Sequence, residues 1–237
     1  MFNYQIVVVN DGSVDNTLNI LRNLEDEIGN LVVLTQENLG VSAARYTGIY
    51  ASECDYLTFL DADDYAETDY LQTLYLLIKK HNADVATSRA IMEGRPVEYN
   101  RDEEWIWTRD EAIQEFFIHK KLNGVLWCKM FRKDIFLLAV PNHKMVIYED
   151  SYLVWQIIQK CDRIVRINAG LVNYVYDNVS LTRSRYSMDK CYATWILCQK
   201  IVNDCRDHDM RKFLKAAKKF RRKWCYSAIK AYIKSLI

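Results

Sequence analysis

The chain has 237 residues, of which half are hydrophobic and 27% are charged, and its formal net charge is +1. This composition indicates one folded domain with a sizeable core, excludes a disordered protein, and comes with no internal repeat that would indicate a solenoid. A net charge so close to zero gives no overall field for nucleic acid, and no nucleic-acid-binding motif is present, so we expect no nucleic-acid partner.

The first ninety residues alternate between short apolar runs and helical patterns. Such an alternation predicts βαβα units with right-handed crossovers, and therefore a mostly parallel sheet with helices on its faces. The predicted strands are residues 5–9, 31–35, 56–60 and 84–88, and the predicted helices are residues 16–27, 41–51 and 69–81.

Carboxylates follow two of these predicted strands. Asp11 comes after the first strand, and Asp61, Asp63 and Asp64 come after the strand at 56–60. Ligands of open parallel sheets bind beyond the carboxyl ends of the strands, and carboxylate oxygens are good ligands for Mg²⁺. The pattern therefore predicts a site for a cation or a nucleotide. A solvated turn that caps the next helix is the alternative interpretation of the second group.

The second half is less regular. A turn at 93–96, a helix at 109–120 and a mixed segment at 124–136 are expected to shape the acceptor side of a site. In the mixed segment, Trp127 and Lys129 either contact an acceptor ring and a phosphate, or serve core packing and surface charge. Residues 164–167 and 171–176, which are separated by Asn-Ala-Gly, predict a β-hairpin, after which two helices close the chain.

The last helix is predicted to be basic and amphipathic. Residues 211–234 contain ten Lys or Arg and no acidic residue. Apolar residues recur there at helical spacing: Phe213, Ala217, Phe220, Trp224 and Ala228. Such a helix either lies on an anionic membrane surface with its aromatic residues at the headgroups, or packs on the domain with a solvated basic face.

The seven cysteines indicate free thiols. They form no C-x-x-C pair, and an odd count argues against a disulfide framework, so a reducing cytosol is the simplest compartment. Cys191, Cys198 and Cys205, with Trp195 and Val202 between them, favour the buried stripe of one helix over an array of metal ligands. No apolar run approaches the roughly 20 residues of a membrane-spanning helix. We expect a cytoplasmic protein, peripheral on the inner face of the membrane if its basic helix binds lipid.

Several motifs together resemble those of family 2 glycosyltransferases. V-V-V-N-D-G-S at 7–13, E-N-L-G-V-S-A-A-R at 37–45 and F-L-D-A-D-D at 59–64 look like the successive nucleotide-sugar signatures of that family. The resemblance continues through W-C-K-M-F-R at 127–132 and E-D at 149–150, and reaches about residue 184. It implies the α/β GT-A fold, a Rossmann-like, mostly parallel sheet flanked by helices. Residues 1–187 would form this domain and residues 188–237 a C-terminal helical extension.

The resemblance implies roles for five residues. Asp11 would accept a hydrogen bond from the nucleotide base, commonly uracil, and Arg45 would lie near the nucleoside or its phosphates. Asp61 would approach the ribose or the sugar, and Asp63 would ligate the Mn²⁺ or Mg²⁺ that bridges the diphosphate. Asp150 would be the general base that takes the proton of an acceptor hydroxyl in a single inverting displacement. Outside this context, Asp11 also fits a helix cap, Arg45 a solvated charge and Asp150 an acidic first helical turn.

The implied function is metal-assisted, inverting transfer of a sugar from a UDP-sugar, or another nucleotide-diphosphate sugar, to a hydroxyl of a glycan or lipid-linked acceptor. One alternative is a truncated, non-catalytic domain that binds a partner or membrane. The other is a haloacid-dehalogenase-like phosphatase, with Asp61 as nucleophile, Asp63 as acid and base, Lys129 on the phosphate and Asp150 on magnesium. The phosphatase alternative leaves the N-D-G-S motif unexplained.

The chain departs from the family pattern at its start. In family 2 enzymes the strand before N-D-G-S is normally preceded by another strand and a helix. That strand would lie centrally, between the strands that end at Asp11 and Asp61. Without it, two sheet edges are expected to lack partners. We therefore expect that the natural protein is longer, or that this form is poorly active.

Overall fold

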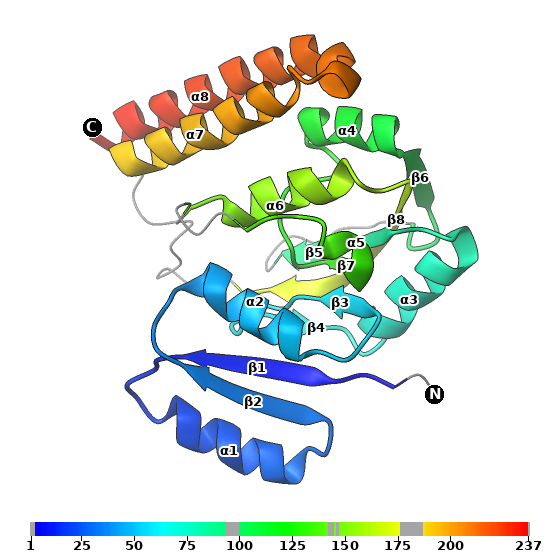
Figure 1. The fold of residues 1–237 in the computed structure, drawn as a ribbon, viewed down its shortest axis with the longest axis vertical. Helices are drawn as coiled ribbons and strands as arrows, with labels where there is room; N and C mark the ends of the chain where they lie inside the picture. The colour runs from blue at the N-terminus through cyan, green and yellow to red at the C-terminus, as the bar shows by residue number, and fades with distance from the viewer. Residues whose placement is uncertain (1–2, 93–99, 142–144, 146, 176–186, 237) are drawn as a thin grey trace.

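The structure, a computed structural model, describes residues 3–92, 100–141, 145, 147–175 and 187–236. It is an α/β fold in which a central sheet is flanked by helices, with a pair of long helices at the C-terminal end (Figure 1). The predicted fold class is therefore confirmed. The turn predicted at 93–96 and the end of the family resemblance near residue 184 lie outside the described residues.

The N-terminal unit, defined as β1, α1 and β2, forms one end of the molecule (Figure 1). The strands β1 (Ile6–Asp11) and β2 (Leu31–Gln36) pair in parallel, from Ile6 opposite Leu31 to Asp11 opposite Gln36. The helix α1 (Thr17–Glu27) connects them. This βαβ arrangement agrees with the predicted strands and helix.

The main sheet contains the other strands. Its order is β3 (Tyr56–Thr58), β7 (Lys129–Arg132), β5 (Val85–Met92), β8 (Arg163–Tyr174) and β4 (Tyr65–Ala66), and β6 (Glu104–Thr108) also pairs with β8. Here β5 and β8 pair in parallel, whereas β7, β4 and β6 pair antiparallel with their neighbours. The pairing is mixed rather than mostly parallel because these short strands return in the opposite direction between the crossovers.

The hairpin predicted across Asn168-Ala169-Gly170 is wrong, because β8 runs through these residues as one strand. A two-residue hairpin turn needs positive φ, and none of the described positive-φ residues lies at 168–170. Instead, the ladder with β5 shifts register around Arg89, and the amide of Asn168 donates to the Glu103 carbonyl at 2.9 Å. The Asn-Ala-Gly sequence therefore marks an irregularity within a long strand, which sequence pattern alone does not distinguish from a turn.

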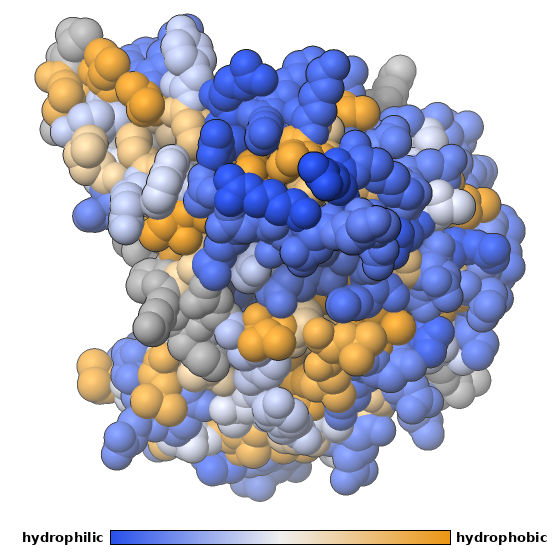
Figure 2. All heavy atoms as spheres, turned by 45° about the horizontal axis from the view of Figure 1, so that its top comes forward, coloured by the Kyte–Doolittle hydropathy of each residue, from blue (hydrophilic) through white to orange (hydrophobic). Residues whose placement is uncertain are grey.

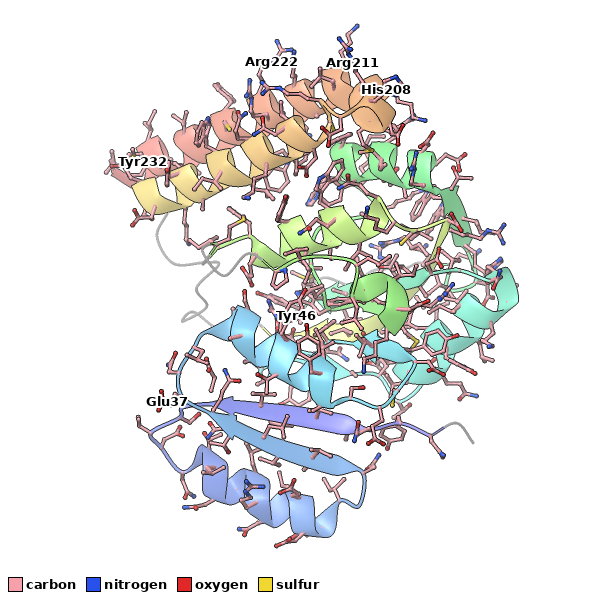
Figure 3. All side chains as sticks on the ribbon, in the orientation of Figure 1. Glu37, Tyr46, His208, Arg211, Arg222 and Tyr232 are labelled. Atoms are coloured by element: carbon pink, nitrogen blue, oxygen red, sulfur yellow. The ribbon has the colours of Figure 1, made fainter. Side chains whose placement is uncertain are left out.

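The sheet is interrupted between β1 and β3. Among the described residues, β1 pairs only with β2 and β3 only with β7, so each strand has one unpaired edge, in agreement with the two unpaired sheet edges expected from the sequence. The helix α2 (Val41–Ala51) spans the interruption. Its Gly48 faces Val9, whose Cγ2 lies 3.4 Å from where a Cβ at residue 48 would be. Its Tyr46 (Figure 3) and its Ile49 are buried in the core of the main sheet.

Helices cover both faces of the main sheet. On one face, α3 (Tyr70–His81) buries Leu74 and Ile78 against Ala86 and Val165. The other face carries the larger core, to which α4 (Arg109–Ile118), α6 (Glu149–Ile158) and the C-terminal helices contribute, while the short α5 (Lys133–Phe136) follows β7. At the start of α4, the side chains of Thr108 and Glu111 form a capping box, which fits the predicted start of this helix.

The C-terminal extension consists of α7 (Met188–Asp204), the 3₁₀ helix η1 (His208–Phe213) and α8 (Leu214–Leu236). The predicted apolar stripe faces the domain: Phe213, Ala217, Phe220 and Ala228 are buried, and Trp224 packs against the same core. The packed-helix interpretation therefore holds for this stripe, so these aromatic residues are not free to insert among headgroups.

The extension shares the core of the rest of the chain. α7 begins at the predicted boundary, yet Leu197 and Ile201 belong to the same buried cluster as α4 and α6. In addition, the indole Nε1 of Trp155 in α6 donates to the Asp204 carboxylate at 2.8 Å. The division of the chain into a domain and an extension at residue 187 stays a prediction. The two parts share one hydrophobic core, so packing does not separate them.

The predicted cysteine stripe is largely confirmed. Cys198 and Val202 in α7 and Cys205 directly after it are buried, whereas Cys191 is only partly buried and Trp195 is 47% exposed. All seven cysteines are free thiols. Within the described residues, none of the helices combines the length and apolar character needed to cross a membrane.

Candidate active site

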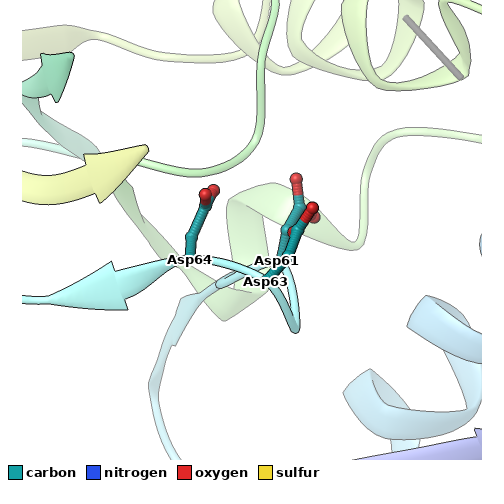
Figure 4. A group of neighbouring side chains, drawn as sticks. All are labelled: Asp61, Asp63 and Asp64. Atoms are coloured by element: carbon teal, nitrogen blue, oxygen red, sulfur yellow. The ribbon is translucent and has the colours of Figure 1, made fainter. Parts of the chain in front are cut away.

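Three carboxylates gather in the loop between β3 and β4. One oxygen from each of Asp61, Asp63 and Asp64 lies within 4.8 Å of the others, and all three side chains point to the same side of the loop (Figure 4). The loop is closed by a turn in which the amide of Asp64 donates to the Asp61 carbonyl at 3.1 Å. The structure therefore brings together all the acids that follow this strand, and a hard oxygen donor set of this kind suits Mg²⁺ or Mn²⁺.

Asp64 is the buried member of the group. Its Oδ1 accepts a hydrogen bond from the Val175 amide at 3.0 Å, but its Oδ2 is buried with no partner among the described residues. Burial raises the pKa of this carboxyl group, and the negative charges of Asp63 and Asp61 add to the effect. A buried carboxylate oxygen without a donor is costly, so the residues fit a cation that would take this oxygen as a ligand.

Arg45 connects the acidic cluster to α6. Its Nη1 lies 2.7 Å from Oε1 of Glu149, and its Nη2 lies 3.9 Å from Oδ1 of Asp61. Burial raises the pKa of Asp61, Arg45 opposes that shift, and Asp63 and Glu149 reinforce it. The guanidinium therefore connects two acidic segments that are far apart in the sequence. Because Arg45 is paired and largely buried, the alternative of a solvated helix charge is excluded.

Asp150 lies in the first turn of α6, next to Glu149. The residue before them, Tyr148, has a left-handed backbone with φ of 65°, a conformation that a bulky residue adopts only under constraint. Oδ1 of Asp150 accepts from the Ser151 amide at 2.6 Å. Burial, followed by the charge of Glu149, raises the pKa of Asp150 to about 6. A carboxylate with this pKa is ionised at neutral pH and is a better proton acceptor than an ordinary aspartate.

Lys129 lies inside the protein rather than on its surface. It is 1% exposed, and its Nζ donates to the Asn123 Oδ1 at 2.9 Å and the Val125 carbonyl at 2.7 Å. Burial lowers its pKa to about 8. Surface charge, one of the two expectations for this residue, is therefore wrong.

The residue before it, Cys128, has φ of 61°, and Trp127 stacks on Tyr174 with 5.5 Å between ring centroids. Two non-glycine residues with positive φ, Cys128 and Tyr148, therefore lie in or beside the motifs of the second half. Strained backbone of this kind concentrates where side chains must be held in one arrangement.

Asp11 lies in the N-terminal unit, where it organises the segment that leads into α2. Its Oδ1 accepts from Gln36 Nε2 at 2.7 Å and from the Leu39 amide at 2.9 Å, and its Oδ2 accepts from the Gly40 amide at 2.8 Å. The bond from Leu39 is the largest cause of its lowered pKa. Asp11 thus stabilises the approach to α2, whereas the alternative interpretation placed it as a cap of α1.

Two glycines permit this arrangement. Gly12 has φ of +74°, and a Cβ there would lie 2.8 Å from the Asn38 amide nitrogen. Gly40, the residue before α2, has φ of +88°. Both conformations are strained for any residue with a side chain, so the loops around Asp11 need glycine at these positions.

The predicted site residues form one connected arrangement. Asp11 organises the start of α2, and Arg45 on α2 contacts Asp61 and the neighbour of Asp150. Sequence reasoning missed Glu149 as the partner of Arg45 and did not name Asp64 as a metal ligand. The adjacency of Glu149 to Asp150 was visible in the sequence, but its pairing with a residue 104 positions away was not.

Comparison with known proteins points in one direction. The family described as "Glycosyl transferase family 2" matches residues 1–137. The chain is 25% identical over 234 residues to the Cholesterol galactosyltransferase of Borreliella burgdorferi, and this alignment covers 89% of this chain and 64% of that protein. It is 28% identical over 199 residues to Glycosyltransferase GlyA of Streptococcus pneumoniae, and this alignment covers 76% of this chain and 27% of that protein. The chain thus spans less than two thirds of either relative.

Solved structures share the fold. S. aureus TarS 1–349 in complex with UDP-GlcNAc aligns with a TM-score of 0.69 at 20% identity, covering 98% of this chain and 70% of that chain. The same protein in complex with UDP aligns with a TM-score of 0.63 at 20% identity, covering 84% and 56%. At this identity the likeness is one of architecture.

Proposed function

Because the chain belongs to glycosyl transferase family 2, we propose that it transfers a sugar from a nucleotide-diphosphate donor to a hydroxyl of a glycan or lipid-linked acceptor. A UDP-sugar is the first donor candidate. Support comes from the galactosyltransferase name of one relative and from the UDP-GlcNAc bound to a protein of the same fold. The observation that carries the proposal is that Arg45 contacts both Asp61 of the acidic cluster and Glu149, the residue before Asp150.

The donor is held by residues from both sheets. Asp11 is proposed to face the base, and Arg45 to lie near the nucleoside or its phosphates. Asp61 is proposed to approach the ribose or sugar, and Asp63, with Asp64 as a further ligand, to hold Mn²⁺ or Mg²⁺. Such an ion, when bound, stabilises the negative charge that develops on the departing diphosphate.

Asp150 is proposed as the general base. It takes the proton of the acceptor hydroxyl while that oxygen forms a bond to the anomeric carbon, and the bond from this carbon to the diphosphate breaks. Attack from the face opposite the leaving group inverts the configuration, and the proton is later released to water. The raised pKa of Asp150 suits this role because a base titrating near 6 accepts a proton readily yet stays ionised at pH 7.

The decisive assay is a screen of nucleotide sugars in Mn²⁺ and in chelator. The wild type should transfer or hydrolyse at least one donor in Mn²⁺ and lose this activity with the chelator. UDP binding with neither transfer nor hydrolysis of any donor would instead favour the non-catalytic alternative. A covalent aspartyl-phosphate analogue trapped at Asp61 would favour the phosphatase alternative.

We further propose that the chain acts at the cytoplasmic face of a membrane, through the outer face of η1 and α8. Basic side chains on this face, including Arg211 and Arg222, point into solvent (Figure 3). Exposed apolar side chains gather at the free end of the α7–α8 pair (Figure 2): Tyr192, Trp195, Tyr226, Ile229, Ile233 and Leu236. Cations near an anionic leaflet each contribute about 1 kcal/mol, and exposed apolar residues add insertion energy.

Vesicle sedimentation tests this membrane proposal. The protein should bind vesicles that contain phosphatidylserine and bind neutral vesicles weakly, and Lys218→Gln/Lys219→Gln/Arg222→Gln should weaken binding to the anionic vesicles by at least tenfold. The control Lys79→Gln/Lys160→Gln alters exposed lysines outside the extension. Equal binding of wild type and the α8 variant would contradict the proposal.

A further inference from the structure

A cationic cavity lies beside the candidate active site. It has a volume of about 290 Å³, near the lower end of the usual range for small-molecule sites. Four basic side chains line it, Arg89, Lys120, Lys121 and Arg166, together with Trp105, Trp127 and polar residues. None of the described lining residues is acidic. Neither the acidic cluster nor Asp150 lines this cavity, so the proposed transfer chemistry leaves it unassigned.

Three of these basic groups contact carbonyl, amide and aromatic groups. Arg166 donates from Nη1 to the Lys121 carbonyl, and its Nε is buried without a partner among the described residues. The Nζ of Lys121 lies 3.9 Å from the ring centroid of Trp105, and Arg89 donates to the Asn168 Oδ1 at 3.0 Å. Burial, followed by the nearby charge of Arg89, lowers the pKa of Arg166 to about 10.

Two carboxylates lie near the cavity without lining it. Glu115 accepts from the Lys121 amide at 2.8 Å, and its charge acts on Arg166. Glu103 accepts from the Asn168 side chain at 3.1 Å. The described lining residues themselves are basic or neutral, so an anion that enters the cavity meets cations first.

The cavity adjoins the active site on two sides. The loop that supplies Lys120 and Lys121 continues to Gly124, which packs so closely on Ser151 that a Cβ there would lie 2.5 Å from its hydroxyl. Ser151 directly follows Asp150. On the other side, Trp127 stacks on Tyr174, and the next residue, Val175, donates its amide to Asp64. The cavity walls therefore connect, through Gly124 and through Trp127, to the residues that adjoin Asp150 and Asp64.

We propose that the cavity binds a phosphate group carried by the acceptor, which makes the acceptor a phosphorylated glycan, polyol or lipid. This inference rests on the proposed sugar transfer, since it names the acceptor class of that reaction. A phosphate offers several acceptor oxygens and up to two negative charges, which matches several donors from two guanidinium and two ammonium groups better than a single carboxylate does. Phosphate binding would also satisfy hydrogen-bonding capacity that Arg166 does not use within the protein.

A titration with inorganic phosphate tests the cavity itself. NMR signals of the indole N–H groups report binding, with a chelator present so that no metal-bound phosphate contributes. The signals of Trp105 and Trp127 should shift with saturation, and Lys120→Gln/Lys121→Gln should weaken this binding by at least tenfold. Because Lys120 is exposed and Lys121 partly exposed, this variant should fold, and its far-UV spectrum checks that. Lys79→Gln/Lys160→Gln, with the same loss of charge on another surface, should bind phosphate within twofold of wild type.

Measurement of UDP affinity in Mn²⁺ on the same proteins separates this inference from the proposed function. Absent shifts at Trp105 and Trp127, or equal phosphate affinity in the Lys120/Lys121 variant, would overturn the cavity assignment while leaving UDP binding intact. If the wild type binds phosphate in the cavity but does not bind UDP, the result would count against the proposed transfer instead.

Matched acceptors test the substrate class. Acceptors should be compared in three forms, with a phosphate, with a carboxylate in its place and with neither. The phosphorylated form should be used best, and Lys120→Gln/Lys121→Gln should raise its KM by about tenfold with little change in kcat, the pattern of lost substrate binding. Equal use of neutral and phosphorylated acceptors, or a preference for the carboxylate, would overturn the assignment to phosphate.

Discussion

The N-terminal unit and the main body of the molecule are built differently. In α1 none of the described residues is buried, and the helix meets β2 partly through polar contacts, such as the Glu25 carboxylate that accepts from the Val33 amide at 2.6 Å. In α6, by contrast, five residues are buried, and Trp155 and Ile157 are 0% exposed. The lightly packed unit carries Asp11, whereas the well-packed body carries the acidic cluster and Asp150.

This contrast separates recognition from chemistry. Residues proposed for proton transfer and cation binding lie on elements held by a continuous core, which keeps their geometry precise. The residue proposed to read the base lies on a two-stranded sheet that joins the body mainly through α2. Substitutions in the two regions should therefore have different consequences for activity, stability and donor binding.

The largest effect is expected from Asp150→Asn in the body. Transfer should fall by about 10³-fold, because removal of a general base typically costs 10²- to 10⁴-fold. UDP affinity should stay within about threefold, since Asp150 is not proposed to touch the nucleotide. Steady-state kinetics and calorimetric UDP titration measure the two quantities. Asp162→Asn, at an exposed acidic residue, is the control, and transfer at the wild-type rate in Asp150→Asn would remove the proposed role.

Packing substitutions should separate the two regions next. Ile157→Ala in α6 should lower the free energy of unfolding by about 2–5 kcal/mol, because it deletes a fully buried side chain. Leu24→Ala in α1, where the side chain is 37% exposed, should cost less than about 1 kcal/mol. Urea denaturation of both variants provides the comparison. Similar losses would show that the N-terminal unit is packed as firmly as the body.

The acidic cluster should control metal-dependent donor binding. In Asp63→Ala, UDP affinity in Mn²⁺ should fall on the order of tenfold to a hundredfold, in line with the loss of a metal ligand or its support. Without divalent metal, the variant and wild type should bind UDP equally weakly. A titration with and without chelator measures this difference. The same loss of affinity in both conditions would indicate a role for Asp63 other than metal binding.

The raised pKa of Asp150 predicts how activity depends on pH. A base must be unprotonated to accept a proton, so kcat should fall about tenfold per pH unit below pH 6. The same shift has a consequence for stability. The folded state holds this proton more tightly than the unfolded state, so its contribution is present below pH 3.8 and is lost as the pH rises through about 6.

Asp150→Asn should therefore remove a cost that the folded wild type carries at pH 8, and should raise stability there by about 1–2 kcal/mol. Denaturation at pH 4 and pH 8 gives the readout. A variant that is less stable than wild type at pH 8 would contradict the assignment of a carboxylate whose charge is destabilised by burial and by Glu149.

The smallest effect is expected from Asp11→Asn in the N-terminal unit. The asparagine side chain keeps one accepting oxygen, but its NH2 group takes the place of the other. This NH2 donor then faces the backbone N–H of Leu39 or Gly40, which is also a donor, and the start of α2 is disturbed. UDP affinity should fall a few-fold, with little change in overall stability, since the loop is exposed. Calorimetric titration and thermal unfolding test both parts. A large loss of stability with unchanged UDP affinity would make Asp11 purely structural.

Much of this arrangement could be predicted from local sequence. The alternation of apolar runs and helical patterns located α1, α2, α3, β1, β2 and β5, because each element has its own periodicity of apolar residues and its own boundary residues. The acidic ends of two strands identified Asp11 and the cluster at 61–64, since the topology of such units brings strand ends to one edge. The Asn-Ala-Gly segment was mistaken for a turn because a turn and a strand irregularity use the same residue types.

The sequence by itself determined the family, the order of the first elements and the acidic candidates, because these depend on short-range patterns and on motifs in a given order. Only the tertiary structure decided that Arg45 pairs with Glu149, that Lys129 is buried, that Asp64 has an orphaned oxygen and that four cations line one cavity. Some of these features join residues far apart in the sequence, as Arg45 and Glu149 are at 104 positions. Their charges and hydrogen bonds depend on burial and distance, which are properties of the packed chain and not of any local segment.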